Sequence, residues 1–317
     1  MKVLITGAAG FLGRRLTREL IARGSLTDSA GHMRKITQII LADLAQIAPP
    51  PSSDIPIEGM QGDLADPAYV ARLGGFDSLF HLASQLTLQS EQNPDHGFAV
   101  NSGALHGLIM ATQGRPKLVF ASSIAIFGAG LPEVVDDHVE PVPLTSYGTH
   151  KALNELIISD YSRHGRIDGR ALRLPIVVTR PGAAQPAVSD RVAALLREPL
   201  EGRDIAAPFA PETLLPLASA GAVVRALIAL HEQPAEALPP KRALNLPALS
   251  VRVQDLGRAL ARAGAKGALT YAPEPQLQAI VDGWPQRFTS RYAAELGLAP
   301  DASIEAIIED YHMNRAG

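Results

Sequence analysis

The sequence predicts an α/β protein with a doubly wound parallel sheet and a smaller, mostly helical C-terminal region. In the first half, short β-branched runs alternate with longer amphipathic stretches, which is the pattern of βαβ units. A glycine-rich turn joins the first run to the first amphipathic stretch. After about residue 181, Pro and Gly become frequent and helical periodicity returns only in separate segments.

Hydrophobic spacing predicts the individual elements. Near-continuous apolar runs are typical of strands that helices cover on both faces. Such runs lie at residues 3–7, 36–42, 78–83 and 117–122, with a further candidate strand just before residue 61. Helical spacing covers residues 11–23, 98–113 and 147–163, and in the C-terminal region residues 219–232, 252–263 and 302–311. The polar segment 24–35 is predicted to be a surface insertion.

The composition excludes several kinds of chemistry. Hydrophobic residues make up 46% of the 317 residues and the net charge is −3, so neither sign of charge dominates and no nucleic-acid partner is expected. The absence of cysteine excludes disulfides, thiolate metal sites and a cysteine nucleophile. The histidines have no metal-ligand spacing, so no metal is expected. Without a signal-peptide pattern or a long apolar run, the expected location is the cytoplasm.

The turn "TGAAGFLG" spaces Gly7, Gly10 and Gly13 as G-x-x-G-x-x-G between a strand and a helix. Glycines at these positions allow a tight turn, close approach of the backbone to a pyrophosphate and close helix packing. The N-terminus of the helix favours the negative charge of the phosphates. In a Rossmann-type sheet this turn would bind a dinucleotide, although three spaced glycines alone are equally well explained as a structural turn.

Two carboxylates near strand ends bear on the choice of cofactor. Asp43 follows the second strand, where it would accept hydrogen bonds from the adenosine ribose hydroxyls and would repel a ribose phosphate. Asp63, in "QGDLAD", is placed to meet the adenine amino group. Solvated loop carboxylates are the alternative. With the glycine turn, these residues predict NAD rather than NADP.

Tyr147 and Lys151, in "TSYGTHK", are four residues apart and so share one face of a predicted helix. A free tyrosine has a pKa near ~10, but a neighbouring ammonium and an oxidised nicotinamide would favour the phenolate, so the pair is a candidate base. Ser123, at the carboxyl end of a strand, would face the same crevice as the glycine turn and hold a substrate oxygen. The alternatives are a surface helix with accidental spacing and a serine that caps a turn.

As a set, these motifs resemble the extended short-chain dehydrogenase/reductase family, which contains nucleotide-sugar epimerases and dehydratases. The resemblance covers residues 1–182 and is carried by "TGAAGFLG", Asp43, "GDLAD", "HLAS", Asn101, "SSIAIFG" and "SYGTHK". It implies that Tyr147 accepts or donates the proton, that Lys151 lowers its pKa and binds the nicotinamide ribose, and that Ser123 orients the substrate hydroxyl. Phe127 replaces a tyrosine that the family often has.

The resemblance also implies a set of NAD-binding residues. The segment 81–84, "HLAS", would line the cofactor, Asn101 would steady the site through its helix, and residues 175–177 would pass the nicotinamide amide. The full set is Gly7, Gly10, Phe11, Leu12, Gly13, Asp43, Asp63, Leu64, Leu82, Ala83, Ser84, Asn101, Tyr147, Lys151, Pro175, Ile176 and Val177. We therefore expect an NAD-binding Rossmann domain at residues 1–181 and a substrate-binding region at 182–317, of which about 215–235 returns to the first domain.

A finer resemblance is to one subfamily, the D-erythronate dehydrogenases, and the run 146–175 is its most distinctive part. It implies that the 2-hydroxyl of a four-carbon sugar acid is oxidised to a 2-keto acid, with Ser123 and Tyr147 on the hydroxyl. Arg180 is the candidate for the substrate carboxylate, with an ion pair elsewhere as the alternative. The segment 211–221, "PETLLPLASAG", lacks the aromatic and histidine residues of related dehydrogenases, so the acid itself stays open.

Two other functions fit the same residues. A nucleotide-sugar epimerase uses the same Tyr, Lys and Ser and retains its NAD, but the second half has no clear nucleoside diphosphate motif. A cofactor-binding regulator would need no base, and the intact Tyr147 and Lys151 argue against it. As in the family, the predicted helices at 98–113 and 147–163 would form the contact of a homodimer, because each carries apolar residues on more than one side.

Overall fold

The computed structural model describes residues 1–47, 53–178 and 187–315, and the chain divides into two compact units. The first unit contains the N-terminal part of the chain and two later segments that return to it. Its segments are Met1–Ser123, Thr145–Arg173 and Leu227–Leu244, and those of the second unit are Ile124–Leu144, Leu174–Ala226 and Asn245–Gly317. The assignment of cofactor and substrate binding to separate domains stays a prediction.

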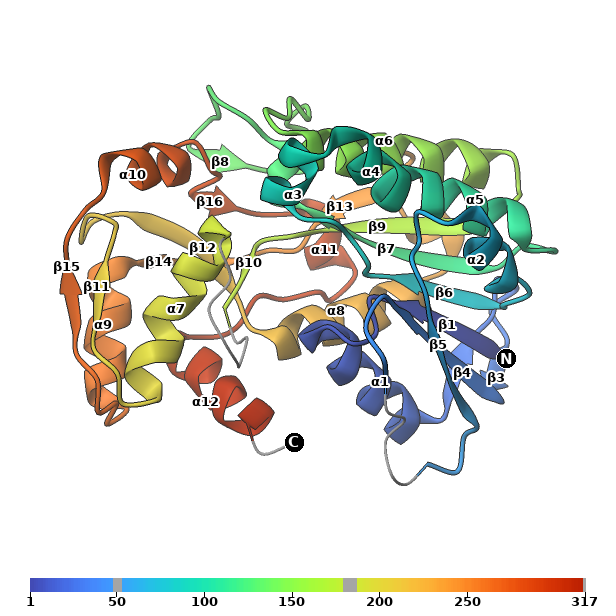
Figure 1. Cartoon of the computed structure of the whole chain (residues 1–317), viewed down its shortest axis with the longest axis horizontal. Coiled ribbons are helices and arrows are strands. Elements are labelled where there is room, and N and C mark those ends of the chain that lie inside the picture. The colour runs from blue at the N-terminus through green and yellow to red at the C-terminus, as the bar shows by residue number, and fades with distance from the viewer. Residues whose placement is uncertain (48–52, 179–186, 316–317) are drawn as a thin grey trace. The chain divides into compact units, whose positions relative to one another are not determined.

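A seven-stranded sheet forms the centre of the first unit, with the strand order β13-β9-β7-β6-β1-β4-β5 (Figure 1). Its strands are β1 (Lys2–Thr6), β4 (Gln38–Asp43), β5 (Ile57–Gln61), β6 (Ser78–His81), β7 (Lys117–Ser123), β9 (Asp168–Leu174) and β13 (Ala243–Asn245). Strand β1 pairs in parallel with both β4 and β6, so that Val3 lies opposite Ile39 and Ser78. The chain reverses its direction across the sheet between β1 and β6, and ligands of doubly wound sheets bind at such a switch point.

Helices cover both faces of this sheet (Figure 1). They are α1 (Phe11–Arg23), α2 (Pro67–Arg72), α3 (Thr87–Gln92), α4 (Pro94–Phe98), α5 (Ala104–Ala111), α6 (Ser146–Arg163) and the last turns of α8 (Ala220–Glu232). Helices α5 and α6 lie over one face and α1 over the other. Leu4, Leu79 and Leu118 of the sheet and Leu108 and Ile158 of the helices are fully buried in one core. The predicted doubly wound α/β fold is confirmed, because apolar strands sit between two helical layers as their composition requires.

One predicted helix is interrupted in the structure, and the predicted surface insertion contains strands that were not predicted. The segment 98–113 is not one regular helix, because a π turn at Ala99–Gly103 separates α4 from α5. The insertion 24–35 forms a two-stranded antiparallel hairpin, β2 (Ser25–Thr27) with β3 (Met33–Lys35). Most of the insertion is exposed or half-buried, but Leu26 is fully buried. A three-residue strand with one apolar side chain is too short to give a periodic signal.

In its described residues, the second unit combines helices with three small sheets. Its helices are α7 (Val188–Leu200), α9 (Val253–Arg262), α10 (Pro275–Asp282), α11 (Arg291–Glu295), α12 (Ile304–Arg315) and the first turns of α8. Its sheets pair β10 (Ile176–Val177) with β12 (Leu214–Ala218) and β14 (Leu249–Arg252), β11 (Ile205–Ala207) with β15 (Leu269–Tyr271), and β8 (Val134–Val135) with β16 (Arg287–Phe288). These strands were not predicted, because they span two to five residues. No helix among the described residues has the length and apolar character to cross a bilayer.

Candidate active site

The glycine turn between β1 and α1 packs directly against the loop that follows β6. Gly7 has a φ of +71°, and a Cβ there would lie 2.7 Å from the backbone nitrogen of Ala83. A Cβ on Gly13 would lie 2.6 Å from the Cα of Ala8. Any side chain at either position would push the helix or the loop away, so both positions require glycine. Gly10 precedes α1, and no side chain caps the helix N-terminus.

Asp43, at the end of β4, is hydrogen-bonded to the glycine turn. Its Oδ2 accepts the backbone N–H of Ala9 at 2.9 Å and its Oδ1 accepts that of Ala45 at 3.0 Å. Each carboxylate oxygen can accept more than one hydrogen bond, so the group can hold the turn and still bind a ribose hydroxyl. The structural contact to Ala9 was not predicted from the sequence, since it joins residues that are 34 positions apart.

These residues fit a dinucleotide. Gly7 and Gly13 allow the tight turn and the close packing of α1, Gly10 presents no side chain at the start of α1, and an acidic group stands at the neighbouring strand end. Asp63 follows β5, and its Oδ1 accepts the backbone N–H of Ala65 at 2.8 Å. NAD bound here would supply the redox chemistry, with its phosphates at the turn and its adenosine ribose at Asp43.

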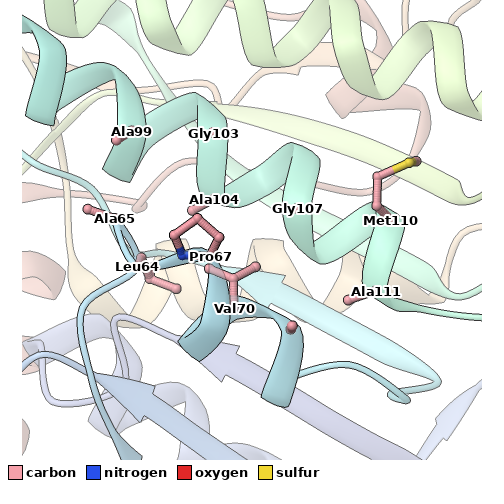
Figure 2. Close-up of a pocket in the computed structure, with 11 residues that line it drawn as sticks. Leu64, Ala65, Pro67, Val70, Ala99, Gly103, Ala104, Gly107, Met110 and Ala111 are labelled. Carbon is pink, nitrogen blue, oxygen red and sulfur yellow. The ribbon is translucent and has the colours of Figure 1, made fainter.

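Leu64, another predicted cofactor contact, is 8% exposed and lines a pocket of about 380 Å³. Figure 2 shows this pocket between α2 and the segment formed by the π turn Ala99–Gly103 and α5. Its walls are mostly apolar, with Val70 from α2 facing Gly107 from α5. A Cβ on Gly107 would lie 2.9 Å from Val70 Cγ1, which accounts for the close approach of the two helices.

Tyr147, Lys151 and Ser123 come together between β7 and α6. Thr145 caps α6 by accepting the backbone N–H of Gly148 at 3.1 Å, so the helix begins one residue before Tyr147. The Lys151 Nζ donates to the carbonyl of Ala121 at 2.7 Å and lies 5.4 Å from the centre of the Tyr147 ring. The Ser123 hydroxyl is hydrogen-bonded to the Tyr147 phenol. The three predicted catalytic side chains therefore share one place, while their roles stay predictions.

Burial acts against the charged forms of both ionisable groups. It raises the pKa of Tyr147 to about 12, and the hydrogen bond with Ser123 acts in the opposite direction. It lowers the pKa of Lys151 to about 7, and the carboxylate of Glu155 opposes that effect. The Tyr147 phenolate and the Lys151 ammonium stabilise each other, because their charges are opposite. The reactive form of the pair therefore requires both charges to be present together.

Asn101 joins the loop after β6 to α6. Its Oδ1 accepts from Ser84 Oγ at 3.1 Å and from the backbone N–H of Gln85 at 2.7 Å, and its Nδ2 donates to His150 Nδ1 at 3.2 Å. Its own carbonyl accepts from Asn154 Nδ2 at 2.8 Å. Asn101 lies in the π turn, and such turns are frequent at functional sites. His150 and Asn154 were not predicted, because only the fold brings this π turn next to α6.

The other predicted contacts come from the loop after β6, which packs on the glycine turn, and from the second unit. Leu82, Ala83 and Ser84 are half-buried in the loop after β6. Pro175 is buried in the second unit, where residues 176–177 form β10. Arg180 lies outside the described residues. Among the described residues, no three His, Asp or Glu side chains are grouped as a metal site would require.

Comparison with known proteins assigns the family. Residues 3–246 match the model of the NAD dependent epimerase/dehydratase family. The chain belongs to this family. The enzyme is 39% identical to a D-erythronate dehydrogenase of Cupriavidus necator, with 100% of this chain and 99% of that protein covered, and 34% identical to one of Haemophilus influenzae, with 98% of each covered. The crystal structure of a nucleoside-diphosphate-sugar epimerase from Agrobacterium tumefaciens matches with a TM-score of 0.93 and 33% identity, covering 100% of this chain and 95% of that one.

With this family and the observed sheet, the enzyme is an NAD-dependent oxidoreductase of the extended short-chain dehydrogenase/reductase type. The predicted fold, cofactor and enzyme class are thereby confirmed.

Proposed function

We propose that this enzyme oxidises the 2-hydroxyl of a small sugar acid of the D-erythronate type to a 2-keto acid, with NAD as the electron acceptor. The proposal rests on its relatedness, over practically the whole chain, to two proteins named D-erythronate dehydrogenase. The cluster of Tyr147, Lys151 and Ser123 supports it, because alcohol oxidation requires a base next to the hydroxyl.

In the proposed reaction, the chain's own residues handle the proton. Bound NAD⁺ supplies the acceptor for the hydride that leaves carbon 2. Ser123 orients the substrate hydroxyl toward the Tyr147 oxygen, to which its own hydroxyl is hydrogen-bonded. The Tyr147 phenolate takes the hydroxyl proton and becomes neutral. The Lys151 ammonium, 5.4 Å from the tyrosine ring centre, stabilises the phenolate before this transfer.

The test is an NADH assay with D-erythronate and related 2-hydroxy acids. We expect net NADH with D-erythronate, and we expect deuterium at carbon 2 to slow the step and to appear in the reduced cofactor. L-threonine and a nucleoside-diphosphate sugar are the comparison substrates. Purified, folded enzyme that binds NAD but produces no NADH from any small 2-hydroxy acid would contradict the proposal.

A nucleotide-sugar epimerase is the second candidate, and the match to the Agrobacterium tumefaciens epimerase structure favours it. An epimerase uses NAD without net consumption, so it would convert the sugar nucleotide while NADH stays constant. The two candidates therefore give opposite results in the same assay.

We propose Arg180 as the partner of the substrate carboxylate, from the sequence alone. An arginine binds a carboxylate with two parallel hydrogen bonds, which lysine cannot reproduce. Arg180→Lys is then expected to raise KM for the acid more than it lowers kcat. An unchanged KM would remove Arg180 from the site.

We also propose a homodimer formed through α5 and α6. Met110 on α5 is 43% exposed and Leu156 on α6 is 70% exposed, so each helix offers a large apolar side chain to such a contact. His106 and Tyr161, hydrogen-bonded at 3.0 Å, link the two helices. Light scattering of wild-type protein and of Leu156→Glu tests this arrangement. The cytoplasm remains the location that we expect from the sequence.

A further inference from the structure

Three consecutive residues at the carboxyl end of β7 each contact one residue of α6. The three α6 residues are four positions apart, so they lie on one face of the helix, one turn above another. The pairs are Tyr147 with Ser123, Lys151 with Ala121, and Glu155 with Ser122. The proposed reaction uses the first two pairs and leaves the third, Glu155, without a role.

Glu155 is bound from two strands. The Ser122 hydroxyl of β7 donates to Glu155 Oε1 at 2.6 Å. Arg173 of β9 donates from Nε to Oε1 and Oε2, at 3.0 and 3.2 Å, and from a terminal nitrogen to Oε2 at 2.8 Å. The side chains of Glu155 and Arg173 are 6% and 2% exposed. A carboxylate held by a two-pronged guanidinium and a hydroxyl has little freedom to move, so it fixes α6 against both strands.

A buried ion pair does not by itself make the folded state more stable than an apolar pair would. Well-packed apolar side chains of similar volume often serve a buried site equally well, because two charges must first be removed from water. A carboxylate at position 155 does one thing that an apolar residue cannot do. It places a negative charge one helical turn behind Lys151, which is 3% exposed.

The other titratable groups near Lys151 do not supply that charge. Burial lowers the pKa of His81 on β6 to about 3 and also lowers the pKa of His150 on α6, so both rings are neutral at pH 7. Tyr147 is neutral until it loses its proton. Among the described groups that interact with Lys151, Glu155 is the anionic one, and its carboxylate raises the pKa of Lys151 against the effect of burial.

We propose that Glu155 is a positioning residue for the reaction: held by Ser122 and Arg173, it sets α6 on the end of β7 and keeps the ammonium of Lys151 charged next to Tyr147. This inference rests on the proposed function insofar as Lys151 and Tyr147 act as the base pair. It adds a requirement that the proposed function lacks, namely a carboxylate at 155 rather than any residue that fills the space.

The direct test measures the ionisation of Lys151 in Glu155→Gln. The chain has six lysines, so ¹³Cε-lysine NMR gives few signals, and Lys151→Met identifies the one that matters. We expect the pKa of Lys151 to fall by about one unit, since an opposite charge at close range shifts a pKa by this order. The alkaline limb of the pH profile of kcat is expected to move to lower pH by the same amount.

A double variant separates electrostatics from packing. Glu155→Gln leaves the buried Arg173 without the opposite charge of Glu155, which destabilises the chain, so Glu155→Met with Arg173→Met removes both charges together. If Glu155 served only to neutralise Arg173, this double variant would restore the wild-type pKa of Lys151 and the wild-type alkaline limb. The proposal expects restored folding with the pKa of Lys151 still lowered, by less than in Glu155→Gln because the positive charge of Arg173 is removed as well.

Asp168→Asn is the matched control. Asp168 is also a buried carboxylate on an ion pair, with Arg170 and Arg242, but it lies at the opposite end of β9. We expect this variant to lose stability and to leave the pKa of Lys151 unchanged.

The NMR measurement needs no substrate, so the two proposals fail separately. An unchanged Lys151 pKa in the folded double variant overturns the role of Glu155 even if D-erythronate is oxidised. Failure to oxidise any 2-hydroxy acid overturns the proposed function, while a lowered Lys151 pKa would still support the charge effect of Glu155.

Discussion

The central sheet buries one lysine near each of its ends, and the two lysines have different surroundings. Burial lowers the pKa of Lys151, at the carboxyl end, to about 7 and that of Lys117, at the amino end, to about 8. Lys117 Nζ donates to Thr27 Oγ1 at 3.0 Å and to the carbonyl of His231 at 2.7 Å. Lys151 donates to one carbonyl and faces the Tyr147 ring. A lowered lysine pKa is therefore not enough to identify a catalytic residue. What distinguishes Lys151 from Lys117 is the ionisable Tyr147 beside it.

The hydrogen bonds that Lys117 and Arg170 make at the amino end of the sheet have a structural explanation. Arg170 donates to the carbonyls of Leu230, His231 and Gln233 at 3.0, 3.0 and 2.8 Å. These carbonyls belong to the C-terminus of α8, where the helix dipole is negative and the last carbonyls lack helical partners. Lys117 and Arg170 thus fasten α8 to the sheet. At the carboxyl end of the sheet, the ammonium of Lys151 lies next to the ionisable phenol of Tyr147. The satisfaction of a helix end does not account for this arrangement.

The largest expected effect comes from making the same substitution at both lysines. Lys151→Met removes the charge that stabilises the Tyr147 phenolate and is expected to lower kcat by roughly 10²–10⁴-fold, as loss of a general base does. Lys117→Met leaves the His231 carbonyl with one donor fewer and is expected to cost about 1–3 kcal/mol of the free energy of unfolding. Steady-state kinetics and urea unfolding of both variants check this.

The reverse result would break the comparison. If Lys117→Met lost activity while its NAD affinity and unfolding midpoint stayed at wild-type values, the amino end would have a role in the reaction that its hydrogen bonds do not show. If Lys151→Met kept most of its kcat, Tyr147 would have to ionise without the ammonium.

The sequence was sufficient to predict the strands and helices that place residues at the two ends of the central sheet. Buried strands have continuous apolar runs and helices have four-residue spacing, so local pattern was enough to place Ser123 at a strand end and Tyr147 and Lys151 on one helix face. The spacing also contains Glu155, four residues after Lys151, and a third polar residue on that face was a signal that could have been used. Its partner Arg173 could not be found in this way, since strand residues carry no sign of which helix they meet.

Contacts between distant segments account for the other omissions. The π turn has no periodic signature, so neither the break in segment 98–113 nor the hydrogen bonds of Asn101 to His150 could be predicted. Asp43 was predicted to bind a ribose, and its contact to the glycine turn depends on the parallel pairing of β1 and β4. The sequence indicates which residues end strands, but the pairing of those strands decides what each end touches.

A smaller effect is expected from the buried histidines when the pH falls. Burial lowers the pKa of His231 to about 4 from an ordinary value of 6.5, while its hydrogen bond to Glu232 acts in the opposite direction. The folded state therefore binds fewer protons than the unfolded chain between these values. The stability is present above pH 6.5 and is lost as the pH falls toward 4, by up to about 1.4 kcal/mol per pH unit.

The variants His231→Gln and His81→Gln separate stability from activity. Each should flatten the acid side of a plot of unfolding free energy against pH, because each removes one buried neutral histidine. His231→Gln should leave kcat unchanged, whereas His81→Gln should lower it severalfold, since the His81 ring stacks on Phe120, which also contacts Lys151. Urea unfolding at several pH values measures the slope, and an unaltered slope in His231→Gln would exclude this histidine as its source.

The smallest effect is expected on the outer face of α6. Asp160 and Arg163 form an ion pair at 2.6 Å, but their side chains are 55% and 69% exposed. In the single chain water screens such a pair, so Asp160→Ala should change the free energy of unfolding of the monomer by less than about 0.5 kcal/mol. It should also leave the alkaline limb of kcat in place. This variant and Glu155→Gln each remove one negative charge from α6. The two differ because the side chain of Glu155 is buried against the sheet, whereas that of Asp160 is exposed. If both variants moved the alkaline limb equally, any charge on α6 would act on Lys151, and the contacts of Glu155 with Ser122 and Arg173 would have no special part in the reaction.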